Sequence, residues 1–98
     1  MRLTTKEIQA IKKVFQEVFS DGKIYLFGSR IDDSKKGGDI DLYIDLSYKL
    51  TVKEELKKRS EFRVKLYEII GEQKIDIVIS KDKSRSIEKE ILKTGVLL

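Results

Sequence analysis

Two residue types that carry much of enzyme chemistry are missing from the sequence. It contains no cysteine, which excludes disulfides and thiolate zinc sites. It contains no histidine either, which excludes histidine-based catalytic triads, histidine general bases and imidazole metal ligands. The metal ligands that remain are oxygen atoms, and these suit magnesium, manganese or calcium.

Long apolar runs are missing as well. No run approaches the roughly 18 apolar residues of a membrane-spanning helix, and the N-terminal segment lacks the apolar stretch of a signal peptide. We therefore expect a cytoplasmic protein that does not associate with membranes. With 98 residues, of which 40% are hydrophobic, the chain is predicted to form one domain, residues 1–98, around a single core.

The net charge of +4 is modest, since 21 basic residues face 17 acidic ones. The densest basic cluster is interleaved with glutamates and comprises Lys53, Lys57, Lys58, Arg59, Arg63 and Lys65. We interpret this cluster as a solvated helix face, with a surface for nucleic acid or an acidic partner as the alternative. Direct binding of nucleic acid is not expected.

Two capping-box patterns predict the starts of two helices, Thr4 with Glu7 and Thr51 with Glu54. The first helix has apolar residues at spacings of three and four and ends near residue 20, and the second runs to about Ile70. Strands are predicted at 24–27, 39–46 and 74–80, a short helix capped by Ser84 or Ser86 around 87–93, and an edge strand at 96–98. The order predicts a small α/β (α+β) sandwich, a mixed sheet of three to four strands with helices packed on it.

A Gly-Ser turn follows the first predicted strand, and such a turn can seat phosphates. Gly28 has no Cβ to keep the backbone away from a phosphate, and the Ser29 hydroxyl with nearby N–H groups, at a helical turn starting there, would hold the phosphates. Arg30 is placed to neutralise phosphate charge, as are Lys35 and Lys36 in the following loop.

Acidic residues occur in two of the predicted strands where a core pattern would not supply them. Asp39 and Asp41 project from one face of their strand, with Cα atoms about 6 to 7 Å apart, and carboxylates that close repel each other unless a cation lies between them. Asp76 interrupts an otherwise apolar strand. If these strands are neighbours, three carboxylates converge, which suits two metal ions about 3.5 to 4 Å apart. Asp76 could also accept the proton of an attacking hydroxyl. Asp45 follows the same alternation and is assigned to the exposed end of its strand.

Each of these motifs has an ordinary explanation when taken alone. Gly-Ser is common in turns, and Asp-x-Asp is common on solvent-facing strands. Arg30 is then a surface residue, and Asp76 an acid at a strand edge paired with a lysine. The functional interpretation depends on their occurring together.

Together the residues resemble a known family. Gly28-Ser29, nine intervening residues and Asp39-Ile40-Asp41 resemble the signature of the DNA polymerase β-like nucleotidyltransferase superfamily. The chain length and the run 26–30 are similar to the minimal nucleotidyltransferases (MNT proteins). Their spacer is often ten residues, and a loop can absorb a difference of one. Asp76 occupies the position of the third acid in that family.

The resemblance implies an enzyme that binds Mg-NTP, transfers a nucleoside monophosphate to an acceptor and releases pyrophosphate. Two Mg²⁺ ions and ATP as substrate are expected. The site residues carried over are Gly28, Ser29 and, as a weaker transfer, Arg30 for nucleotide binding, and Asp39, Asp41 and Asp76 for metal binding and catalysis.

The resemblance also implies a partner. Many MNT proteins are encoded beside a HEPN-domain toxin of the RNase type and act as its antitoxin by adenylylating it, often at a tyrosine. We therefore expect a hetero-oligomer with a HEPN protein, which would supply the acceptor. The alternative is an antitoxin that neutralises its partner by complex formation alone, with nucleotide regulating the contact. Transfer to a small molecule or an RNA end is a third, weaker hypothesis.

Overall fold

A computed structural model describes residues 2–31 and 38–98. Its elements, in chain order, are α1 (Thr5–Phe19), β1 (Lys23–Phe27), the 3₁₀ turn η1 (Gly28–Ile31), β2 (Ile40–Asp45), α2 (Val52–Ile70), β3 (Ile75–Ile79), α3 (Ser86–Thr94) and β4 (Val96–Leu97). The predicted fold class and the predicted order of helices and strands are both confirmed, including the short edge strand near the C-terminus. The helical turn expected from Ser29 begins one residue earlier, at Gly28.

The capping boxes determine where the two long helices begin. Thr4 and Thr51 each accept a hydrogen bond from the backbone N–H of the glutamate three residues on, and each glutamate bonds back to the backbone N–H of its threonine. Such a cap satisfies two backbone donors that a helix start would otherwise leave unpaired. Both predicted helix starts are confirmed.

The predicted cap of the last helix is wrong. Arg85 is the N-cap of α3 and makes no side-chain cap bond. Ser84 instead donates its hydroxyl to Asp82 Oδ1 at 2.6 Å, and Ser86 already lies inside the helix. Serine favours such local turn contacts as readily as a cap, and sequence spacing alone does not separate the two.

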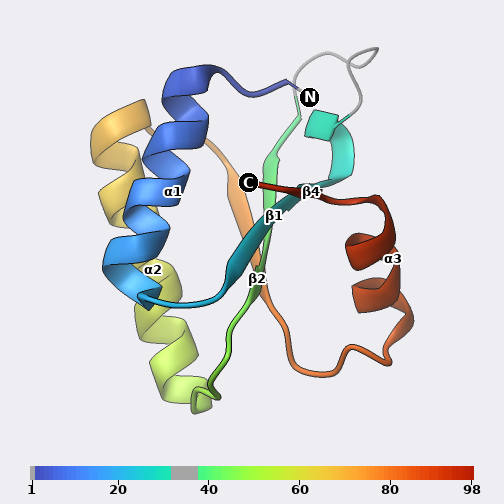
Figure 1. The fold of residues 1–98 in the computed structure, drawn as a ribbon. Coiled ribbons are helices and arrows are strands. Elements are labelled where there is room, and N and C mark those ends of the chain that lie inside the picture. Colours follow the sequence, from blue (N-terminus) through green and yellow to red (C-terminus); the bar gives the residue numbers. More distant parts are fainter. Residues whose placement is uncertain (1, 32–37) are drawn as a thin grey trace.

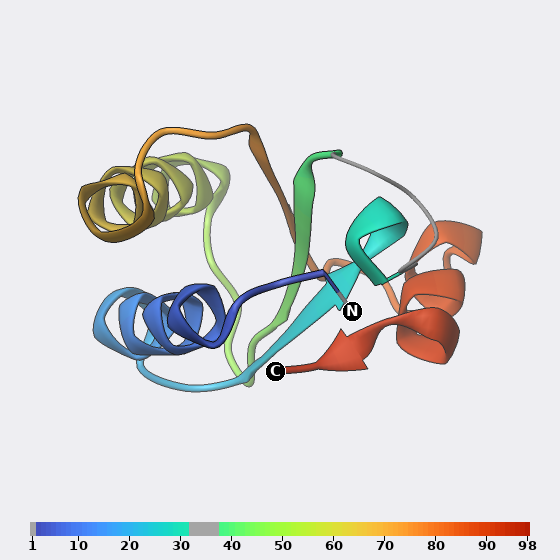
Figure 2. The same ribbon diagram turned by 90° about the horizontal axis from the view of Figure 1, so that it is seen from above.

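The four strands form one mixed sheet in the order β3-β2-β1-β4. β2 and β3 are parallel and are joined by the α2 crossover, whereas β1 is antiparallel to both β2 and β4. Helices α1 and α2 cover one face of the sheet and α3 covers the other (Figures 1 and 2). No helix in the described part of the chain is long and apolar enough to cross a membrane.

The hydrophobic core lies between the sheet and the pair α1 and α2. Alternate residues of β2, namely Ile40, Leu42 and Ile44, are fully buried on this side. They meet aromatic side chains from both helices, and the rings of Phe19 and Phe62 lie 6.0 Å apart. Burying each such side chain contributes about 1.5 to 3 kcal/mol. The other residues of β2 are thereby turned toward the α3 face.

A single buried carboxylate fastens α3 to the sheet. Glu88 is 1% exposed and accepts hydrogen bonds from the Tyr43 hydroxyl (2.7 Å), the Ser80 hydroxyl (2.6 Å) and the backbone N–H groups of Lys81 (3.1 Å) and Asp82 (2.9 Å). Burial disfavours the charged form of Glu88, but these donors outweigh it and lower its pKa to about 2.

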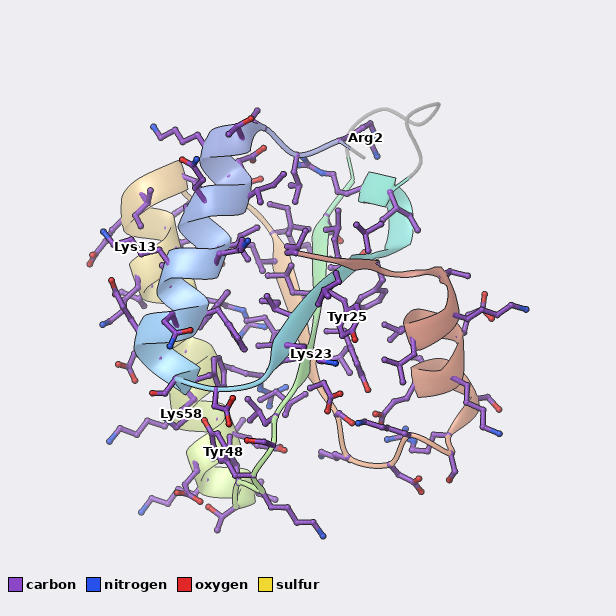
Figure 3. The ribbon with its side chains drawn as sticks, viewed as in Figure 1. Arg2, Lys13, Lys23, Tyr25, Tyr48 and Lys58 are labelled. Carbon is purple, nitrogen blue, oxygen red and sulfur yellow. The ribbon has the colours of Figure 1, made fainter. Side chains whose placement is uncertain are left out.

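Tyrosine rings fill the space beside this carboxylate. Tyr25 of β1 is directed into the layer between the sheet and α3 (Figure 3). Its ring lies 5.8 Å from that of Tyr43, its partner across the strand pair. On the α3 side of the sheet, the buried Tyr43 ring is therefore packed against the ring of Tyr25.

Candidate active site

Two acidic residues lie side by side at the N-terminal ends of the parallel strands. Asp41 and Asp76 are each the second residue of their strand, and the register of β2 and β3 places them directly opposite one another. The alternation along β2 turns Asp41 to the same face as Tyr43. The condition that the acid-bearing strands be neighbours is met. We call Asp41 and Asp76 the acid pair.

The negative charge of Asp41 is disfavoured where it lies. The pKa of Asp41 is raised to about 6, first by burial, then by the negative charge of Asp76 and a hydrogen bond between the two carboxyl groups. The charge of Asp39 raises it further, and the ammonium of Lys74 acts in the opposite direction. A divalent cation would relieve this repulsion, and carboxylate oxygens are the ligands that Mg²⁺ prefers. The donor set of the acid pair therefore fits such an ion.

Asp39 lies just before β2, and its carboxylate is engaged elsewhere. Its Oδ2 is 3.4 Å from the Nζ atom of Lys74, which precedes β3. Within residues 2–31 and 38–98, no group of three or more acidic side chains is arranged to hold a metal ion. The structure thus brings two of the three predicted acids into contact, and the third forms an ion pair with a lysine that the sequence analysis did not single out.

Gly28 lies against the acid pair. It follows β1 with a φ of +76°, a conformation that side-chain-bearing residues rarely adopt. Phe27 is the strand partner of Asp41, and a Cβ atom built on Gly28 would overlap Oδ2 of Asp41. Position 28 therefore requires glycine because the Asp41 carboxylate lies beside it. The Gly-Ser motif predicted the glycine from phosphate binding and did not predict this contact. Ser29 follows in η1.

The other predicted phosphate-binding residues have different surroundings. Arg30 is part-buried, and its guanidinium donates to backbone carbonyl oxygens, among them that of Gly38 at 3.2 Å. Lys35 and Lys36 lie outside the described residues. The assignment of Asp45 to an exposed strand end is wrong, since its side chain is 17% exposed and forms a 2.9 Å ion pair with Lys83.

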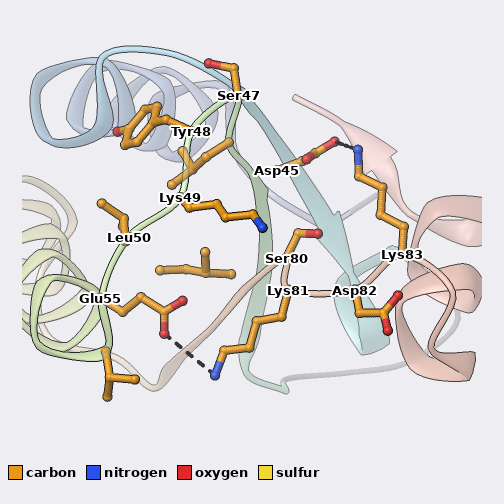
Figure 4. Close-up of a pocket in the computed structure, with 13 residues that line it drawn as sticks. Asp45, Ser47, Tyr48, Lys49, Leu50, Glu55, Ser80, Lys81, Asp82 and Lys83 are labelled. Carbon is orange, nitrogen blue, oxygen red and sulfur yellow. Dashed lines mark ion pairs between the residues drawn. The ribbon is translucent and has the colours of Figure 1, made fainter.

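A cavity of about 700 Å³ lies at the opposite end of β2 and β3, beyond their C-terminal residues. Its charged lining consists of three lysines and three carboxylates, and ion pairs join Lys81 to Glu55 and Lys83 to Asp45 (Figure 4). The acid pair does not line this cavity. Because its charges largely compensate each other, this cavity has less to offer a phosphate or a metal ion than the acid-bearing end.

Comparison with known proteins places this geometry in a family. A family model described as polymerase beta, nucleotidyltransferase matches residues 9–98. The chain belongs to the polymerase beta nucleotidyltransferase family. The matched range includes the Gly28 turn and all three acids, and the class of chemistry that it indicates is nucleotidyl transfer. A search of curated proteins found no match to the chain.

Proposed function

We propose that this nucleotidyltransferase is an Mg²⁺-dependent adenylyltransferase that moves AMP from ATP to a hydroxyl group of a partner protein. The observation that carries the proposal is the acid pair: Asp41 and Asp76 lie directly opposite each other, and burial and the negative charge of Asp76 raise the pKa of Asp41. An ion pair or a set of hydrogen bonds would be expected around carboxylates that only stabilise the fold. Among residues 2–31 and 38–98, the largest charge effect on the pKa of Asp41 is the repulsion of Asp76, and the ion pair of Lys74 goes to Asp39.

In this proposal Asp39, Asp41 and Asp76 would hold two Mg²⁺ ions, and the Gly28 turn with Ser29 would hold the triphosphate. When bound, the ions would neutralise phosphate charge and act as Lewis acids. Asp39 would have to give up its 3.4 Å ion pair with Lys74 to serve as a ligand. The ammonium of Lys74, which acts on the pKa of Asp41, would attract the anionic nucleotide.

The transfer itself forms one bond and breaks one. The acceptor hydroxyl oxygen attacks the α-phosphorus of ATP, a new P–O bond forms, and the bond to the β-phosphate oxygen breaks with release of pyrophosphate. Asp76, the more exposed member of the acid pair, takes the hydroxyl proton. The β2–β3 register sets Asp41 opposite Asp76, and the missing Cβ of Gly28 leaves room for the Asp41 carboxylate.

We further propose that the acceptor is a tyrosine of a HEPN-domain toxin and that the modification neutralises the toxin in the cytoplasm. This part of the proposal rests on the likeness to minimal nucleotidyltransferases. Binding of a HEPN partner in a hetero-oligomer would bring the hydroxyl to the acid pair.

A non-catalytic antitoxin is the second candidate. One observation favours it: Lys74 already supplies a positive charge to Asp39 at 3.4 Å, so part of the acidic group is neutralised without a metal. In that case nucleotide would only regulate the contact between the two proteins.

Co-expression with the HEPN-domain protein tests both candidates. The intact mass of that partner is measured after co-expression with the wild type, with Asp39→Asn/Asp41→Asn, and with Asp45→Asn. Asp45 is a matched control because it lies on the same strand and face but is paired with Lys83. AMP-sized additions with the wild type and the control only would support transfer. An unmodified partner that stays neutralised by the double variant would support the binding-only antitoxin.

A further inference from the structure

Arg30 connects three separate segments through its side chain. Its Nε donates to the carbonyl oxygen of Gly38 at 3.2 Å, its Nη1 to the carbonyl oxygen of Arg2 at 2.9 Å, and its Nη2 to Oε1 of Gln73 at 3.5 Å. The backbone adds a fourth contact, because the N–H of Arg2 donates to the carbonyl oxygen of Arg30 at 2.6 Å. Arg2 lies beside η1 near the N-terminal end of β2 (Figure 3).

Two of these acceptors stand directly in front of the acid-bearing strands. Gly38 precedes Asp39 and so leads into β2, and Gln73 lies two residues before the start of β3. The first ladder bond between the strands follows at once, from the N–H of Ile40 to the carbonyl oxygen of Lys74 at 3.1 Å. The Arg30 guanidinium therefore links the segment before β2 to the segment before β3. Asp41 and Asp76 follow within a few residues, each as the second residue of its strand.

The chemistry of arginine suits this task. Its guanidinium is planar and presents five N–H donors in a fixed fork, so acceptors that bind it are held at set positions to one another. All three acceptors here are neutral oxygens. The repulsion within the acid pair pushes the N-terminal ends of β2 and β3 apart, and a rigid link across these ends opposes it.

We propose that Arg30 is a positioning residue, which sets the separation of Asp41 and Asp76 by clamping the segments before β2 and β3, and that it does not bind the nucleotide. This inference rests on the proposed function, since it assigns to Arg30 the preorganisation of the proposed metal-binding acids. It replaces the phosphate contact that the motif predicts for this residue.

The test is Arg30→Gln, with Arg59→Gln as the matched control. Arg59 lies on α2 and makes no hydrogen bond or ion pair with the described residues. Two quantities are measured: the affinity for Mn²⁺ by electron paramagnetic resonance, and KM and kcat for ATP. For Arg30→Gln we expect Mn²⁺ affinity and kcat to fall about 10- to 100-fold, as for other residues that orient metal ligands, with KM for ATP nearly unchanged. Arg59→Gln should match the wild type.

Two further variants keep the test decisive if Arg30→Gln unfolds. Arg30→Lys retains the charge but has no planar fork, so it should show the same loss as the glutamine variant. Gln73→Ala removes one acceptor only and should show a smaller loss in the same direction. Circular dichroism and thermal melting verify that each variant is folded.

The outcomes separate this inference from the proposed function. A large rise of KM for ATP with unchanged Mn²⁺ affinity would overturn the clamp and make Arg30 a phosphate ligand. If the wild type transfers AMP and Arg30→Gln has the same Mn²⁺ affinity and kinetics as the wild type, the clamp alone is overturned. A wild type that binds Mn²⁺ but transfers nothing would overturn the proposed function, while the Mn²⁺ measurement would still decide on Arg30.

Discussion

Two carboxylates on the α3 side of the sheet have opposite surroundings. Glu88 is buried beneath α3, accepts four hydrogen bonds and has a pKa lowered to about 2. Asp41 is half-buried at the other end of β2, faces Asp76 and has a pKa raised to about 6. Both carboxylates lose hydration. Within the described residues, Glu88 regains the lost interactions from four donors, whereas the largest charge effect on Asp41 is the repulsion of Asp76.

The difference separates a structural acid from a candidate functional one. A carboxylate surrounded by donors stabilises the fold and offers nothing to a ligand. A carboxylate held against another carboxylate weakens the fold and attracts a cation, which is the usual signature of a functional site. The five predictions below test this division, beginning with the change that should have the largest effect.

Asp41→Asn should abolish the proposed transfer and stabilise the protein. Loss of a metal ligand removes several kcal/mol of transition-state stabilisation, so the transfer rate should fall at least about 1,000-fold. Loss of the repulsion from Asp76 should raise the melting temperature at pH 8. Both quantities are measured against Asp45→Asn, which removes a paired acid of the same strand. A variant that melts lower and still transfers would refute the division.

The two acids should also give opposite pH dependences of stability. The folded pKa of Asp41, about 6, exceeds its ordinary value of 3.8, so its contribution is fully present below pH 3.8 and is lost as pH rises through 6. The folded pKa of Glu88, about 2, is below its ordinary 4.5, so its contribution is present above pH 4.5 and is lost as pH falls toward 2. Denaturant unfolding of the Asp41→Asn and Glu88→Gln variants from pH 3 to 8 measures both differences.

Glu88→Ala should cost about 3 kcal/mol of unfolding free energy at pH 7, because it leaves the donors of Tyr43, Ser80, Lys81 and Asp82 without their acceptor. Tyr43→Phe removes one of these bonds and should cost about 1 kcal/mol. Urea unfolding curves give both values. An alanine variant as stable as the wild type would show that Glu88 does not fasten α3.

Gly28→Ala tests the contact between the Gly-Ser turn and Asp41. Gly71→Ala is the matched control, because Gly71 also has a positive φ, of +84°, but has no atom within 4 Å of an added Cβ. The control should lose about 1 to 3 kcal/mol from backbone strain alone, because its ψ of 166° places it in a region that glycine almost alone adopts. Gly28→Ala should lose about 2 kcal/mol more than the control, because the new methyl also displaces the Asp41 carboxylate. Equal losses in the two variants would contradict this close packing.

Lys74→Gln should have the smallest effect on stability. Its ion pair with Asp39 joins exposed groups, 72% and 39% exposed, so removal should cost no more than about 0.5 kcal/mol. The ammonium of Lys74 lowers the pKa of Asp41, and its removal should therefore raise that pKa further. Carbon-13 NMR titration of the carboxyl groups measures the change. Lys81→Gln, which removes the ion pair to Glu55 at the other end of the sheet, should leave the pKa of Asp41 in place.

Most of the fold was predictable because the periodicities and capping boxes are local signals. The alternation in β2 and the caps at Thr4 and Thr51 depend on neighbours in the sequence, and the structure agrees with each. The helix around 87–93 was predicted, but its capping residue was not, because Ser84 can also form a local turn and bonds to Asp82.

The site was predictable only in part, since its contacts join distant segments. The pairing of Asp41 with Asp76 was anticipated from the acids in two apolar strands. The ion pair of Asp39 with Lys74 and the links of Arg30 to Gly38 and Gln73 were not, because no sequence pattern states which loops meet. The roles of these residues in transfer remain predictions.

Parallel pairing of β2 with β3 makes the acid pair a late product of biosynthesis. Asp41 leaves the ribosome first, and the 19 residues of α2 must follow before Asp76 can emerge and dock beside it. At ordinary translation speeds this interval is on the order of seconds. A nascent chain that ends within α2 therefore lacks the paired carboxylates. The growing polypeptide should not consume nucleotide before β3 has paired with β2.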